Sequence, residues 1–122
     1  MPDFLRRRPA EQHLPLTVPV FQILLALADQ DLHGYAIIQD IRQRTDGEVD
    51  LTASTLYAAI KRLLDGRLID ELATRPNAAD DDPRRRYYRI TALGREVARL
   101  ETERLERTLR LARRKRLALR KA

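Results

Sequence analysis

The chain has 122 residues, a formal net charge of +6 and no cysteine. This length fits one domain with an added arm or helix. The lack of cysteine excludes disulfides, thiolate zinc sites and cysteine nucleophiles. No apolar run approaches the roughly 20 residues of a membrane span, and the N-terminus lacks a signal peptide's apolar stretch. We therefore expect a cytoplasmic protein with a polyanionic partner and no membrane association.

The N-terminal segment, residues 1–16, is rich in proline and carries Arg6, Arg7 and Arg8. Proline-rich, basic segments bury little apolar surface, so we expect a flexible basic arm that takes no part in the core. Two interpretations stay open for it. The arm enters a DNA minor groove, or it is a frayed terminus.

Residues 18–28 are apolar on nearly all sides, with Gln22 the only polar side chain. We expect a helix capped by Thr17, with Pro19 in its first turn, where the backbone N–H needs no partner. A helix apolar all round is buried on more than one side. In so small and aliphatic a protein, the second side suggests a subunit interface or a ligand cavity, and we assign Phe21 and Leu24 to dimerisation.

A polar turn at residues 29–33 precedes a second expected helix, residues 34–44. Tyr35, Ile38 and Ile41 share one face of that helix by their spacing. Asp46 and Gly47 end it, since Asp-Gly is a turn signal. A short linker then leads to residues 51–69, around which the chain is organised.

The pattern of residues 51–69 predicts an amphipathic helix. Thr52 is a good N-cap, Leu56, Ile60 and Leu63 form one stripe, and Gly66 offers a positive-φ stop. The opposite face carries small, hydroxyl, phenolic and cationic side chains: Ser54, Thr55, Tyr57, Ala58, Lys61 and Arg62. Such a face suits a DNA groove, although an ordinary solvated face has the same pattern. The two helices together make a helix-turn-helix.

Two short segments, residues 68–73 and 85–91, are expected to pair as a β-hairpin. Alternation in the second strand places Tyr88 and Ile90 toward the core, and Arg85, Tyr87 and Arg89 outward. The loop between the strands contains Asp80, Asp81 and Asp82. Consecutive carboxylates cannot converge on one ion as spaced ligands do, so we interpret them as a solvated loop tip and expect no metal.

Residues 91–122 are predicted to form one long helix capped by Thr91. Its apolar stripe contains Leu93, Val97 and Leu100, and continues, displaced around the axis, through Leu105 and Leu109. A small domain cannot cover a helix of about 30 residues, so we assign Val97, Leu100, Leu105 and Leu109 to dimerisation. No acidic residue follows Glu106. The basic tail touches nucleic acid or an acidic surface, or is solvated.

Three motifs in this order resemble the PadR-like transcriptional regulators. They are His33-Gly34-Tyr35; Leu51-Thr52-x-x-Thr55-Leu56-Tyr57 with Leu63-x-x-Gly66-x-Leu68-Ile69; and Arg86-Tyr87-Tyr88-Arg89-Ile90-Thr91-x-x-Gly94. The resemblance covers residues 17–98 and is closest to the short branch with a single C-terminal helix. It implies a mainly α fold with a small β-hairpin: an N-terminal arm (1–16), a winged helix-turn-helix domain (17–91) and a C-terminal dimerisation helix with a basic tail (92–122).

By this resemblance, the chain is a homodimeric repressor of an inverted-repeat DNA operator, released by a small hydrophobic or phenolic effector. Ser54, Thr55, Tyr57 and Lys61 then lie on the DNA-facing side of the recognition helix. Arg84, Arg85 and Arg86 lie on the wing, which is the expected β-hairpin with its loop. Family members that bind flat drugs stack them on tryptophan, which this chain lacks. An aliphatic cavity or no effector is therefore expected.

Three other functions are an enzyme, a basic adaptor and a ligand sensor. An enzyme is not expected, because His13 and His33 are the only histidines and no nucleophile–base pair, metal spacing or phosphate-cradling loop is present. We expect no cofactor. A basic adaptor that binds RNA or protein through the arginine-rich C-terminal helix stays open, since fold does not fix function. So does a ligand sensor with a secondary role on DNA.

Overall fold

The computed structural model describes residues 9–73 and 82–117. Its helices are η2 (Glu11–His13, a 3-10 turn), α1 (Val18–Leu27), α2 (Gly34–Arg44), α3 (Ala53–Asp65) and α4 (Ala92–Arg114). Its strands are β1 (Leu32–His33), β2 (Ile69–Glu71) and β3 (Tyr87–Ile90). The fold is mainly helical with one small sheet, as the sequence predicts.

The sheet has three antiparallel strands in the order β1-β3-β2. The expected hairpin is present: Ile69 pairs with Ile90 and Asp70 with Arg89. The sequence analysis missed β1, which it treated as part of a polar turn; Leu32 pairs with Tyr88. Tyr88 and Ile90 face the core, as alternation predicts.

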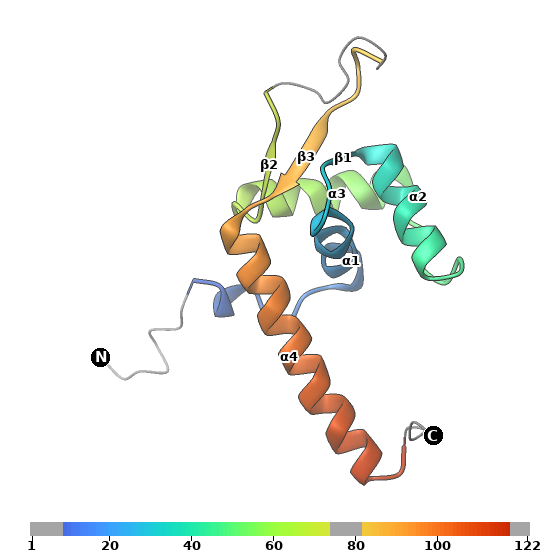
Figure 1. Cartoon of the computed structure of the whole chain (residues 1–122), viewed down its shortest axis with the longest axis vertical. Helices are drawn as coiled ribbons and strands as arrows, with labels where there is room; N and C mark the ends of the chain where they lie inside the picture. The colour runs from blue at the N-terminus through green and yellow to red at the C-terminus, as the bar shows by residue number, and fades with distance from the viewer. Residues whose placement is uncertain (1–8, 74–81, 118–122) are drawn as a thin grey trace.

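Helix α1 lies at the centre of the domain and contacts α2, α3, α4 and β3. Its buried side chains include Ile23 and Leu24, both fully inaccessible to solvent. The second buried side of α1, for which the sequence suggested a subunit interface or a ligand cavity, is therefore covered over most of this helix by elements of the same chain. Figure 1 shows α1 enclosed in this way.

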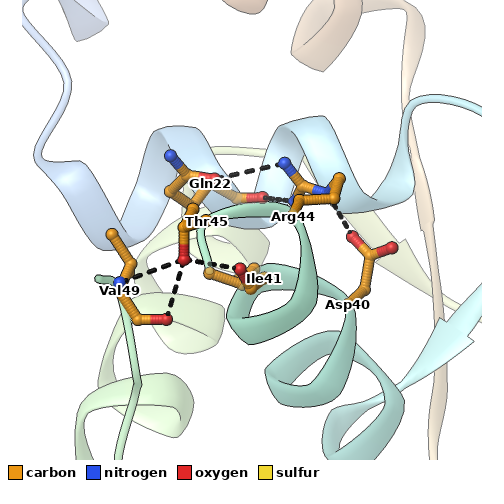
Figure 2. Close-up of polar contacts among 6 residues, drawn as sticks. All are labelled: Gln22, Asp40, Ile41, Arg44, Thr45 and Val49. Carbon is orange, nitrogen blue, oxygen red and sulfur yellow. Dashed lines mark hydrogen bonds and ion pairs between the residues drawn. The ribbon is translucent and has the colours of Figure 1, made fainter. Parts of the chain in front are cut away.

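The C-terminal end of α2 is tied to α1 by polar contacts, which Figure 2 shows. Arg44 pairs with Asp40 (Nε–Oδ2 2.6 Å) and donates to the Gln22 carbonyl oxygen at 3.3 Å. Thr45 donates its hydroxyl to the Ile41 carbonyl and accepts from the Val49 N–H. These bonds close the α2–α3 linker and fix how α3 follows α2.

The three threonine caps are as predicted. Thr17 accepts from the Val20 N–H, Thr52 from the Thr55 N–H and Thr91 from the Gly94 N–H. A hydroxyl that satisfies a free N–H of the first turn stabilises a helix start by about 1 kcal/mol. The three main helices of the expected DNA-binding and dimerisation units therefore begin where the sequence places them.

Two details of the helices differ from expectation. Gly66 ends α3 at φ −83°, and the left-handed position is Arg67, at φ 59°. On α2, Tyr35 is exposed rather than buried, and Ile37 takes its place in the core beside Ile38 and Ile41. Residues 35, 38 and 41 have the spacing of one helix face. The buried face of α2 is rotated about the helix axis from that face, so that it contains Ile37 in place of Tyr35.

The N-terminal segment is not wholly a free arm. Ala10 is buried, Leu14 and Leu16 pack against the core, and the Leu16 N–H donates to Glu101 Oε2 of α4 at 2.7 Å. The expectation that residues 1–16 take no part in the core is therefore wrong for residues 9–16. The arginines at positions 6–8 lie outside the described residues.

Helix α4 is shorter than predicted and only partly covered. It ends at Arg114, followed by Arg116 at φ 60°. Gly94 packs so closely on the residue before β2 that a Cβ there would lie 2.1 Å from the Leu68 carbonyl oxygen. The helix remains packed on the domain as far as Glu101, which is buried, and its C-terminal half then extends away from the other elements (Figure 1). The expected tail at residues 118–122 lies outside the described residues.

Candidate nucleic-acid interface

Helix α3 presents one buried and one open face. Leu56, Ile60 and Leu63 are at most 3% exposed and anchor the helix in the core. All six side chains predicted for the DNA-facing side are exposed: Ser54, Thr55, Tyr57, Ala58, Lys61 and Arg62. The structure thus brings these residues together on a single accessible surface, which we call the α3 face.

The N-terminal half of the α3 face is uncharged and the C-terminal half is cationic. Lys61 pairs with Asp65 one turn later (Nζ–Oδ2 3.0 Å), and both side chains are mostly exposed. Arg62 makes no ion pair within residues 9–73 and 82–117. Exposed ion pairs of this kind contribute little to stability, so Lys61 can exchange its carboxylate for a phosphate.

The wing arginines 84–86 are all exposed, and acidic side chains lie close to them. Arg84 binds Asp82 through its guanidinium (Nη2–Oδ2 3.0 Å) and its backbone N–H (2.9 Å). These hydrogen bonds, with the positive charge of Arg84, lower the pKa of Asp82 to about 2. Arg86 lies 3.7 Å from Glu71 of β2. Asp82 therefore pairs on the wing, while Asp80 and Asp81 lie outside the described residues.

A groove of about 430 Å³ joins the wing to the helix-turn-helix. Its lining comes from the start of α2, from α3 and from the wing: His33, Gly34, Tyr35, Tyr57, Arg84, Arg85, Arg86 and Tyr88. Of these, only Tyr57 and the three arginines were predicted to bind DNA. The groove brings them together, which their separation in sequence did not reveal.

The His33-Gly34-Tyr35 motif has a structural reason in this groove. His33 Nδ1 accepts from the Ala36 N–H at 3.2 Å and so caps α2. A Cβ on Gly34 would lie 2.7 Å from the hydroxyl oxygen of Tyr57. Glycine therefore lets α2 approach α3, and leaves the exposed Tyr35 ring at the groove. The His33-Gly34-Tyr35 motif was the available signal for Tyr35, but the helical spacing only grouped this side chain with Ile38 and Ile41.

A second groove, of about 460 Å³, lies where the start of α1 meets α3. It is lined by Thr17 and Val20 from α1, and by Ser54, Thr55, Ala58 and Arg62 among the residues of α3. The α3 face thus lies between two concave surfaces, one on the side of the wing and one on the side of α1.

The residues assigned to dimerisation divide into two sets. Leu24 and Val97 are fully buried within one chain and offer no surface to a partner. Phe21 and Leu100 are half-buried. Leu105 and Leu109 are each 41% exposed on the projecting part of α4. Of the six assigned residues, these four offer surface on which a second chain could pack.

The described residues offer neither a metal site nor a membrane span. In the described parts of the chain, no group of three His, Asp or Glu side chains could hold a metal ion. None of the helices there has the length and hydropathy to cross a bilayer.

Residues 23–100 match the model of the transcriptional regulator PadR-like family. An uncharacterised protein from Lysinibacillus sphaericus is 36% identical over 73 residues, which are 60% of this chain and 64% of that protein. This chain therefore spans less than two thirds of that relative's length.

Solved structures with the same fold are also found. A transcriptional regulator from Clostridium thermocellum is 28% identical with a TM-score of 0.66, over 93% of this chain and 97% of that one. A PadR family transcription regulator from Clostridium difficile is 23% identical with a TM-score of 0.69, over 80% and 97%. Bacillus subtilis PadR in complex with operator DNA is 22% identical with a TM-score of 0.58, over 70% and 46%. The last two likenesses show the fold alone.

Proposed function

Because the chain belongs to the PadR-like family of transcriptional regulators, we propose that it is a homodimeric repressor of an inverted-repeat DNA operator. A member of this family is a transcription regulator and not an enzyme. The dimer, the operator symmetry and the sign of regulation are the proposal. The α3 face, open along its length and joined to the wing by a groove, is the observation that carries it.

In this proposal α3 enters the major groove, which is about 12 Å wide and admits one helix. The first two turns of α3 carry no acidic side chain, so nothing repels the phosphates that flank the groove. Ser54, Thr55 and Ala58 are short enough to let the helix end approach base edges. Lys61 and Arg62 reach phosphate oxygens, which positions the helix without reading sequence.

The wing arginines bind the backbone next to the major groove. Arg84 and Arg86 face carboxylates that are exposed to solvent, so exchange of those partners for phosphate costs little desolvation. Tyr35 and Tyr57 supply hydroxyl donors to the same groove. The wing and α3 then contact the same duplex, α3 in the major groove and the wing on the adjacent backbone.

A second copy of the chain would cover the projecting half of α4. Leu105 and Leu109 are exposed there at helical spacing, and Phe21 and Leu100 continue the partly open apolar surface. Burial of such side chains contributes about 25 cal/mol per Å². Two-fold symmetry of the protein would then be matched by two half-sites about one helical turn of DNA apart.

Selection of bound duplexes from a random pool tests this proposal. We expect an inverted repeat to be recovered, and its affinity, measured by fluorescence anisotropy, to fall with salt at a log–log slope of about −0.9 per phosphate contacted. A scrambled duplex of equal length is the control for sequence preference. Recovery of no common sequence, or an affinity that salt leaves unchanged, would contradict the proposal.

One observation favours a second candidate, the basic adaptor. Four arginines gather on one surface of α4: Arg107, Arg110, Arg113 and Arg114. If the chain binds RNA there, single-stranded RNA should compete with the selected duplex. Charge reversal at Arg110 and Arg114 should then abolish the competition by RNA and leave the binding of the duplex unchanged. Duplex binding that RNA does not disturb would favour the repressor.

The release of the operator by a small molecule is also part of the proposal. The family resemblance suggests an effector, and the chain has no tryptophan on which a flat drug could stack. A thermal-shift screen with phenolic and cationic amphiphilic compounds tests this, because a ligand that binds only the folded chain raises its Tm.

A further inference from the structure

A small cavity of about 100 Å³ lies between the N-terminal segment, α1 and α3, apart from the groove at the wing. Its apolar walls include Leu16, Val20, Leu63 and Leu68, and the polar groups include His13 and Arg62. Neither the sequence motifs nor the proposed DNA contacts explain why the N-terminal segment packs here.

The walls of the cavity are fixed by the fold. Val20, Leu63 and Leu68 are at most 7% exposed and belong to the core. The outer wall is held by Glu101, whose carboxylate accepts the Leu16 N–H at 2.7 Å. His13 packs against Gly66, where a Cβ would lie 2.9 Å from the ring Cε1. The cavity is therefore formed before any ligand enters.

The polar groups of the cavity are available to a ligand. Across residues 9–73 and 82–117, the side chains of His13 and Arg62 make no hydrogen bond or ion pair. A guanidinium is a strong binder of carboxylates, because its two parallel N–H groups match the two oxygens. A cavity with apolar walls and one cationic group favours an anion whose remaining atoms are apolar.

We propose that this cavity binds a small monocarboxylate of about six non-hydrogen atoms, with its carboxylate on Arg62. The size follows from the volume: a cavity of about 150 Å³ accommodates benzene, and this one is smaller. A branched four-carbon acid matches this space in size, and its single negative charge matches the single guanidinium.

Arg62 also connects the cavity to the α3 face. The same side chain lines the groove that holds Ser54, Thr55 and Ala58. A carboxylate in the cavity draws the guanidinium away from DNA phosphate, so ligand and operator compete for one cation. This second step rests on the proposed function. By linkage, binding of the operator must weaken the binding of the carboxylate by the same factor.

The cavity is tested by titration of the ¹⁵N-labelled chain with sodium isobutyrate, followed by NMR. We expect saturable changes in the amide chemical shifts of Leu16, Val20, Leu63 and Leu68. Isobutyramide, which has the same shape without the charge, should cause no changes of this size. Equal shifts with both compounds, or shifts centred on the arginines of α4, would overturn the site.

The coupling is tested on the selected duplex with Arg62→Gln and the matched variant Lys61→Gln. Saturating isobutyrate should raise the Kd of the unaltered chain about tenfold over equal sodium chloride, the cost of one charged hydrogen bond. Lys61→Gln should weaken DNA binding yet keep this response, and Arg62→Gln should lose it. Isobutyrate shifts in NMR without any change in Kd would overturn the coupling. A chain that binds no duplex but shows the shifts would refute the proposed function and leave the cavity standing.

Discussion

Helices α3 and α4 both carry an apolar stripe, but only the stripe of α3 is covered along its length by the same chain. Leu56 and Leu63 of α3 are at most 1% exposed. On α4, Val97 is fully buried, whereas Leu105 and Leu109 are each 41% exposed. Figure 1 shows the cause, since α3 lies within the domain and α4 extends past it. A stripe in the sequence predicts burial, but the fold decides whether the partner lies inside the subunit.

The largest effect on folding is expected in the α3 stripe. Leu56→Ala should lower the free energy of unfolding by about 2–5 kcal/mol, because it leaves a cavity in a fully packed core. Urea unfolding of the dilute, monomeric chain measures this. The same truncation on α4, Leu105→Ala, is the matched control and should cost less than half as much. Equal losses would mean that the subunit covers both stripes.

The projecting half of α4 should instead determine assembly. Leu105→Glu combined with Leu109→Glu places two carboxylates on the surface that we propose a second copy covers. We expect the dimer Kd to rise at least about 100-fold, equivalent to about 2.7 kcal/mol, with an unchanged circular dichroism spectrum. Sedimentation measures the association, and Thr108→Glu on the same helix is the control. A double variant that still dimerises at micromolar concentration would refute this interface.

The sequence predicts local features of the fold better than features that depend on distant residues. Thr52, the α3 stripe and the exposed α3 face were all predicted correctly, because caps and helical periodicity depend on neighbours within a turn. The short strand β1 was missed, since Leu32 becomes a strand only by pairing with Tyr88, which lies far along the chain. Whether the α3 face binds DNA stays a prediction.

The candidate site shows the same division. Periodicity placed Leu24 and Val97 on apolar faces correctly, but it could not tell that their own subunit covers those faces. The groove between Tyr35 and the wing needs three elements to meet. The contact of Leu16 with Glu101 joins residues 85 positions apart, and no local pattern marks a glutamate in the middle of a helix as buried.

Glu101 marks the point where α4 still belongs to the subunit, and its removal should have an intermediate effect. Burial raises the pKa of this carboxyl, but the hydrogen bonds from Arg104 and the Leu16 N–H outweigh it and leave the pKa below its ordinary value. Glu101→Gln replaces the ionised acceptor by a weaker one and should cost about 1–2 kcal/mol.

The pH dependence separates this effect from simple packing. A carboxylate with a lowered pKa stabilises the fold above the ordinary glutamate pKa of about 4.3, and this contribution is lost as the pH falls through the lowered value. The protection factor of the Leu16 amide, which is its hydrogen exchange corrected for the intrinsic pH dependence, should therefore fall at acid pH in the unaltered chain, while in Glu101→Gln it should be low at neutral pH as well. A high, pH-independent protection factor in the variant would show that the carboxylate does not hold the segment.

The smallest effect on folding is expected on the outer side of α3. Lys61 is largely exposed and its pair with Asp65 is solvated, so Lys61→Ala should change the free energy of unfolding by less than about 0.5 kcal/mol. Under the proposed function the same change should weaken binding to all duplexes alike and reduce the salt slope by about 0.9 per subunit. Ser54→Ala is the matched comparison. If Ser54 contacts a base edge, its loss should reduce discrimination at one operator position by about 1–3 kcal/mol and leave the salt slope unchanged. A Lys61→Ala variant that is unstable, or that changes sequence preference, would show that the outer face of α3 is not divided into reading and anchoring halves.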